Sequence, residues 1–133
     1  MSNLKDLVPP LELCKLIPAG EFEDSVHWYR WSYIDQKYLV VEGKPDVRLH
    51  RDPCPCGMKY FYPAPTLQEI LEELHKHQED VFLKWSENAY HEWLVNAYSH
   101  NQNDFQAHDK NSATAALKVW LKLKGIEYGQ KQG

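Results

Sequence analysis

The sequence predicts an α+β fold: an antiparallel sheet of about four strands with two main helices packed on one face, plus a short N-terminal helix. Two observations lead to this fold class. Two segments, 66–77 and 112–124, repeat apolar residues at helical spacing, while other segments are aromatic, β-branched or alternating. The economical packing of these elements is a sheet whose one face is covered by the two longer helices.

The 133 residues are one ordinary domain's worth of chain, and we expect a single domain over 1–133. Hydrophobic residues make up 43% of the chain and aromatic residues 13%, which is enough apolar material for a core. No repeat or linker divides the sequence. The last residues, from about 128 onward, are expected to be a frayed tail.

The first elements are expected to be a short helix and a hairpin. Leu7, Leu11 and Cys14 follow helical spacing near the N-terminus. The segment 26–34 is rich in aromatic and β-branched residues and predicts a strand. Across a short polar turn, residues 37–42 are its predicted hairpin partner.

The central helix has the clearest signal. Thr66 and Glu69 have the spacing of a capping box, which indicates a helix start. Apolar residues then mark one helical face as far as about His77: Leu67, Ile70, Leu71 and Leu74. A short strand is expected just before this helix, over 58–62.

The segment 81–98 is ambiguous. Alternation over 81–85 favours a strand that turns into a second strand over 91–98, and we prefer this hairpin. The apolar residues of 91–98 would also line one face of a helix, which is the alternative. Residues 101–111 are polar and are expected to form a loop. The last helix is predicted from Ser112, with Gly125 as the residue that ends it.

Composition excludes several function classes. Fifteen Lys and Arg against nineteen Asp and Glu give a formal charge of −4, so nucleic-acid binding is not favoured. Stacking of bases on exposed aromatic rings is a weaker alternative. No apolar run approaches a membrane span, and the N-terminus lacks the pattern of a signal peptide. The expected location is cytoplasmic, without a membrane partner.

One local cluster combines residue types that bind metals. His50, Cys54 and Cys56 form H-x3-C-x-C, and His100 or His108 would be the source of a fourth zinc ligand. Structural zinc sites usually begin with two cysteines separated by at least two residues, and this cluster departs from that spacing. A proline-rich turn with two inert thiols explains the same residues. We therefore expect no cofactor, with a zinc site as the alternative.

The aromatic strand is the stronger functional signal. On 26–34, one face carries Tyr29, Trp31 and Tyr33, and the other carries Trp28. Tyrosine and tryptophan on an uncovered face are typical anchors of protein interfaces. The alternative is that the N-terminal helix or the 43–65 loop covers this face.

No catalytic motif accompanies this strand: a glycine-rich phosphate loop, G-x-S-x-G and H-E-x-x-H are all absent from the sequence. We assign no catalytic residue, and an enzyme is not favoured. The expectation is a non-enzymatic interaction protein that binds a protein partner or a second copy of itself.

Three stretches also carry a resemblance to a known group of proteins. They are LVPPLELCKLIPAGEFEDS at 7–25, YPAPTLQEILEEL at 62–74 and SATAALKVWLKLKGIE at 112–127. Together they resemble small uncharacterised proteins encoded by phages and prophages of gut bacteria. The resemblance implies an origin in a mobile element and a setting inside a bacterial host cell. It implies no activity, ligand or catalytic residue.

Overall fold

The computed structural model describes residues 4–46, 58–78, 80–86, 92–98 and 104–128. Contacts between Cα atoms divide the chain into two compact units, unit 1 (Met1–Thr66) and unit 2 (Leu67–Gly133), and each is described by itself. Both units combine helices with antiparallel strands, so the α+β class is confirmed. Within the described residues, no helix is both long enough and apolar enough to span a membrane.

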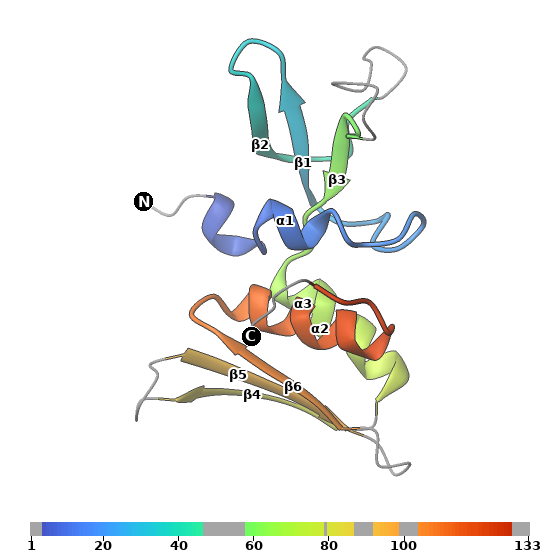
Figure 1. Ribbon diagram of the computed structural model, residues 1–133, viewed down its shortest axis with the longest axis vertical. Helices are drawn as coiled ribbons and strands as arrows, with labels where there is room; N and C mark the ends of the chain where they lie inside the picture. Colours follow the sequence, from blue (N-terminus) through green and yellow to red (C-terminus); the bar gives the residue numbers. More distant parts are fainter. Residues whose placement is uncertain (1–3, 47–57, 79, 87–91, 99–103, 129–133) are drawn as a thin grey trace. The chain divides into compact units, whose positions relative to one another are not determined.

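Unit 1 is a small antiparallel sheet with short helices preceding it (Figure 1). The strand order is β2-β1-β3, so β1 is the central strand and contacts both neighbours. The predicted hairpin is confirmed, and the third strand begins at Phe61 rather than at residue 58. The elements are the 3₁₀ helix η1 (Leu4–Leu7), α1 (Leu11–Cys14), β1 (His27–Ser32), β2 (Lys37–Glu42) and β3 (Phe61–Pro63).

The hairpin turn of unit 1 takes four residues, 33–36, between β1 and β2. Ser32 organises it, because its hydroxyl accepts a hydrogen bond from the Asp35 backbone N–H at 3.1 Å and the Gln36 N–H donates to the Ser32 carbonyl at 2.7 Å. Gln36 has a positive φ of 56°, a conformation that such turns require. The resulting register places Trp31 opposite Tyr38.

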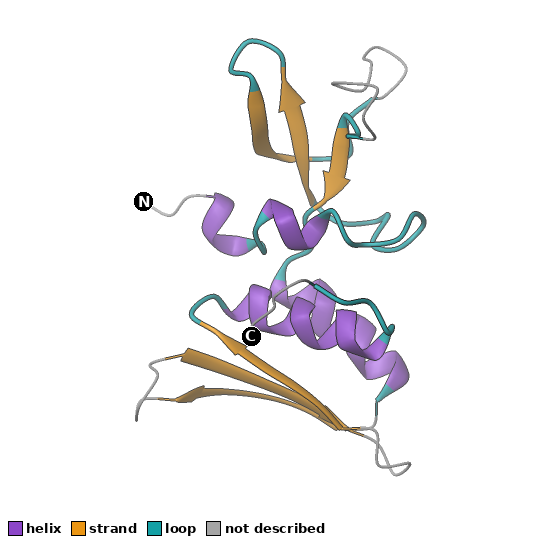
Figure 2. Ribbon diagram, viewed as in Figure 1, coloured by secondary structure: helices purple, strands orange, loops and turns teal. Residues whose placement is uncertain are grey.

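Unit 2 has two helices on one face of a three-stranded antiparallel sheet of order β4-β5-β6 (Figure 2). Helix α3 contacts β5, β6 and α2, and α2 also contacts β4. The two longer helices thus cover one face of this sheet, whereas the sequence predicted them on a single sheet that also includes the 26–42 hairpin. The elements are α2 (Leu67–His77), β4 (Asp80–Ser86), β5 (Glu92–Tyr98), β6 (Asp104–Asp109) and α3 (Ser112–Leu123).

Two sequence predictions about the strands need correction. The expected single sheet of about four strands is instead two three-stranded sheets among the described residues. The expected polar loop over 101–111 contains strand β6. Ala107 of β6 is buried opposite Val95 of β5, so pairing and burial of alternate residues outweigh the weak strand propensity of the polar ones. For 91–98, the hairpin is confirmed and the helical alternative is wrong.

The core of unit 2 is centred on α3. Leu117, Val119, Trp120 and Leu121 of this helix are fully buried, and so are its small residues Ala115 and Ala116. Full burial of each large apolar side chain contributes about 1.5–3 kcal/mol relative to exposure. Gly125 follows the helix with a φ of 75°, the left-handed conformation predicted for the residue that ends it.

The N-terminus of α3 generates the first prediction. Asn111 caps this helix, because its side-chain oxygen accepts hydrogen bonds from the Thr114 backbone N–H at 2.9 Å and the Thr114 hydroxyl at 3.1 Å. Asn111→Ala should lower the free energy of unfolding by about 1 kcal/mol, measured by urea denaturation followed by circular dichroism. The neighbouring exposed Lys110→Ala is the control and should match the wild type. Equal stability of both variants would show that the cap contributes nothing.

Candidate functional site

The candidate site of unit 1 is built on one face of the β1–β2 hairpin. Antiparallel pairing places Trp31 directly opposite Tyr38 and Tyr29 opposite Tyr62 of β3, so these aromatic side chains share a face. The ring centroids of Trp31 and Tyr38 lie 5.1 Å apart, and those of Tyr38 and Tyr62 lie 5.7 Å apart. These spacings fall in the range of favourable edge-to-face and tilted aromatic contacts.

The aromatic row continues beyond the sheet. Tyr33, in the hairpin turn, contacts Trp31 edge-to-face at 6.5 Å and stacks on Tyr60 at 6.2 Å with an interplanar angle of 18°. The Tyr38 hydroxyl donates a hydrogen bond to the Lys59 carbonyl at 2.6 Å, which fixes the orientation of that ring. The rings are therefore held by contacts with one another and with the backbone.

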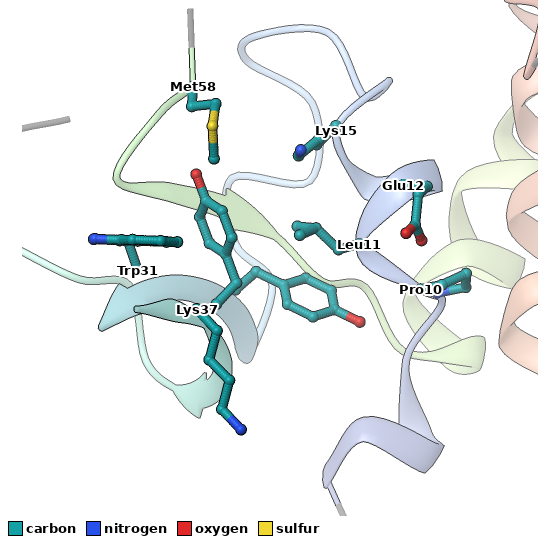
Figure 3. A pocket seen from close by; sticks show the side chains of 9 residues that line it. Pro10, Leu11, Glu12, Lys15, Trp31, Lys37 and Met58 are labelled. Atoms are coloured by element: carbon teal, nitrogen blue, oxygen red, sulfur yellow. The ribbon is translucent and has the colours of Figure 1, made fainter. Parts of the chain in front are cut away.

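A groove of about 470 Å³ lies along this face, and we call it the aromatic groove. Figure 3 shows Trp31 on one side of it and Leu11, from helix α1, on the other. Its lining residues come from α1 and the residues on either side of it, from the β1–β2 hairpin and from the segment before β3. They are Pro10, Leu11, Glu12, Lys15, Tyr29, Trp31, Lys37, Tyr38 and Met58.

Exposed charges surround the aromatic rings of the groove. The Lys15 ammonium lies 5.9 Å from the centroid of the Tyr38 ring, which is within the range of a cation–π contact. Lys37 is a second exposed cation of the lining, and Glu12 is its exposed anion. The groove thus combines an apolar floor with an excess of positive charge. It is suited to an apolar or aromatic group that carries a carboxylate nearby.

The three residues predicted to bind a partner take different positions on this face. Tyr29 is buried, with 6% of its surface exposed, and its hydroxyl donates a hydrogen bond to the Pro9 carbonyl at 2.6 Å. Trp31 is half-buried in the groove, and Tyr33 is 44% exposed. The N-terminal segment therefore covers the Tyr29 end of the face, while Trp31 and Tyr33 keep accessible surface.

Among the groove residues that sequence reasoning missed, Tyr38 and Lys15 are the ones that contact each other. Tyr38 belongs to the predicted strand 37–42, and the alternation along that strand was the signal that could have placed it beside Trp31. Lys15 directly follows α1, and no local pattern in the sequence connects it with a strand more than twenty residues away.

Cys14, the last residue of α1, does not carry a reactive thiol. Cys14 has no exposed surface, and burial, together with the nearby Glu12 carboxylate, raises the pKa of its thiol well above the usual range. Because the thiolate is the nucleophilic form, this cysteine packs as a small apolar side chain. Its Sγ contacts the same Pro9 carbonyl at 3.7 Å that accepts the Tyr29 hydrogen bond.

The residues of the predicted metal cluster, His50, Cys54 and Cys56, lie outside the described residues, as does His100. His108 is described and belongs to β6 of unit 2, where its Nδ1 lies 2.6 Å from a carboxylate oxygen of Glu92. In the part of the chain that the structure describes, no group of three or more His, Cys, Asp or Glu side chains is placed to hold a metal ion.

Comparison of the chain with protein-family models, with curated proteins and with solved structures found no match.

The Tyr29 hydrogen bond gives the second prediction. Tyr29→Phe keeps the ring but leaves the Pro9 carbonyl without this donor, and should lower the free energy of unfolding by about 1 kcal/mol at neutral pH.

Burial also raises the pKa of the Tyr29 hydroxyl above its ordinary value of 10.0. The wild type therefore loses stability as the pH rises past that value, because the unfolded chain ionises first. The stability difference between wild type and Tyr29→Phe should narrow at alkaline pH. Urea titrations at neutral and alkaline pH test both statements, and a difference that stays constant or grows would contradict the second.

Proposed function

We propose that this chain is a non-enzymatic interaction protein and that the aromatic groove of unit 1 binds a segment of a protein partner. The observation that carries the proposal is the row of mutually held aromatic rings beside α1, with Trp31 and Tyr38 half-buried and Tyr33 exposed. Partly exposed Trp and Tyr side chains in a concave, pre-ordered setting are the residues that most often dominate binding energy at protein interfaces.

The chemistry of the groove lining indicates which kind of partner segment would bind. Trp31 and Tyr38 offer apolar and π surface, which suits an aromatic or large aliphatic side chain. Lys15 and Lys37 suit a carboxylate close to that side chain, and such charges favour encounter with an acidic segment. The proposed ligand is therefore an apolar residue flanked by Asp or Glu in a partner protein.

The cellular setting is also part of the proposal. The resemblance of residues 7–25, 62–74 and 112–127 to phage- and prophage-encoded proteins supports a role inside a bacterial host cell. There the partner would be a protein of the host or of the phage.

Paired selections from a random peptide library test the proposal and make the third prediction. Wild-type protein should enrich peptides that combine a large apolar residue with acidic neighbours, and Trp31→Ser should lose this enrichment. For a selected peptide, Trp31→Ser should raise Kd about tenfold or more, as expected for an anchor residue. Ile34→Ser is the matched control, because Ile34 is 94% exposed in the hairpin turn and does not line the groove. Its affinity should equal that of the wild type.

A second variant keeps the test informative if Trp31→Ser fails to fold. Lys15→Glu changes an exposed side chain and reverses the charge beside the Tyr38 ring. The selected peptides should then shift from acidic toward basic flanking residues. Selection of the same peptides by wild type, Trp31→Ser and Lys15→Glu would refute binding in the groove.

A further inference from the structure

A different surface, the outer edge of the sheet in unit 2, has the features of a site for pairing with another chain. Strand β4 is an edge of the β4-β5-β6 sheet, and none of the described strands pairs with its outer side (Figure 1). The strand runs over Asp80–Ser86, longer than most, and is mainly apolar. Phe82, Leu83 and Trp85 are exposed by 51%, 37% and 39%. Long apolar edge strands are templates for pairing with another chain, and proteins ordinarily protect them.

The two faces of β4 differ in character. Val81 and Leu83 pair with the buried Ala97 and Val95 of β5, so they lie on the face that the helices cover. Asp80, Phe82 and Lys84 alternate with them and lie on the opposite, open face. Charges at two alternate positions therefore flank a central phenylalanine on one face of the edge.

We infer that β4 pairs antiparallel with β4 of a second copy of this chain, about a two-fold axis at Phe82. In that register Asp80 of each copy lies opposite Lys84 of the other, and Phe82 lies opposite Phe82. On the helix-covered face, Val81 of each copy lies opposite Leu83 of the other. The strand is thus self-complementary in both charge and apolar character, which is what an isologous interface requires.

Neighbouring registers lack this complementarity. An axis at Leu83 would place Phe82 opposite Lys84 and would leave Asp80 without an opposite charge. Directly opposed unlike charges and aromatic pairs stabilise antiparallel strands, whereas mismatched pairs do not, so the axis at Phe82 is favoured.

The surroundings of Phe82 suit a second phenylalanine. Its ring already contacts the Tyr98 ring at 5.6 Å, so the axis would bring four aromatic rings together. A hollow of about 490 Å³ lies beside it, lined by Lys84, Leu94 and Asn96 among others. A second β4 strand would pair with the backbone groups on the outer side of this edge, which none of the described strands contacts.

The inferred dimer goes beyond the proposed function, because it uses unit 2 and leaves the aromatic groove unchanged. Pairing of the two β4 edges would join two three-stranded sheets into one of six strands. A closed two-fold pair satisfies the backbone groups of both edges and stops further growth at that side.

Charge reversal tests the dimer and its register, and is the fourth prediction. Analytical ultracentrifugation of the full chain over a concentration series should show a monomer–dimer equilibrium. Asp80→Lys and Lys84→Asp, both at exposed positions, should each weaken dimerisation about tenfold, because two opposed pairs per dimer become repulsive. The double variant D80K/K84D should dimerise like the wild type. Mixing the two single variants should produce a heterodimer.

A cysteine variant tests the position of the two-fold axis directly. In a chain whose Cys54 and Cys56 are replaced by Ser, Phe82→Cys should form an intermolecular disulfide under mild oxidation, since opposed residues of antiparallel strands lie within disulfide range. Exposed Lys84→Cys, which lies opposite Asp80, is the control and should not cross-link.

Several results would overturn the inference. They are a wild-type monomer at every concentration up to the millimolar range, open-ended aggregation instead of a dimer, or single charge variants that dimerise as well as the wild type. Peptide binding by the groove should be unaffected by the β4 variants, so failure of this inference and failure of the proposed function can be told apart.

Discussion

The constraint on which the rest of this structure depends is that each of its two small sheets needs helices or other segments packed on one face. A three-stranded sheet is stable only when at least one face is packed against other elements. In unit 2, the twelve-residue helix α3 and the eleven-residue helix α2 lie on one face, and Val95 and Ala97 beneath them are fully buried. In unit 1, the neighbouring helix α1 has only four residues. It covers less of its sheet, and the aromatic groove is the part of the face that remains accessible.

The groove owes its order to contacts made for folding. The Tyr29 hydroxyl and the Pro9 carbonyl anchor the N-terminal segment to the sheet, and Tyr38 is held by the Lys59 carbonyl. The first contact ties the N-terminal segment to β1, and the second orients the Tyr38 ring, which packs against Trp31. Contacts made for folding thus order the aromatic surface, and the proposed partner would not have to order it at an entropic cost.

The two surfaces proposed for association arise for different structural reasons. The groove is a sheet face that is not fully covered, whereas the outer side of the β4 edge has backbone groups with which no described strand pairs. The first suits side chains of a partner, and the second suits a strand of the same sequence. If both operate, a dimer carries two grooves, and a partner with two binding segments, or one displayed in many copies, would be held more tightly than by a single groove.

Local patterns in the sequence were sufficient for the elements whose structure is decided within a few residues. Helical spacing predicted α2 and α3 nearly to the residue, Gly125 marked the end of α3 because the left-handed conformation favours glycine, and aromatic and β-branched residues predicted β1 and β2. The aromatic face of β1 was also visible as an alternation. These features depend on spacing and on backbone preference, which neighbouring residues alone determine.

Tertiary structure decided what depends on distant partners. Strand β6 is polar in sequence and forms because Ala107 pairs with Val95, and β3 joins the sheet of unit 1 because it pairs with β1 across a long intervening segment. The burial of Tyr29 depends on Pro9, twenty residues earlier, and the place of Lys15 over Tyr38 depends on where α1 packs. Sequence determined where α2, α3, β1 and β2 form and which residues of β1 are aromatic. Only long-range packing determined which of those aromatic rings the chain covers and which it leaves accessible, because burial is a property of contacts and not of the residue itself.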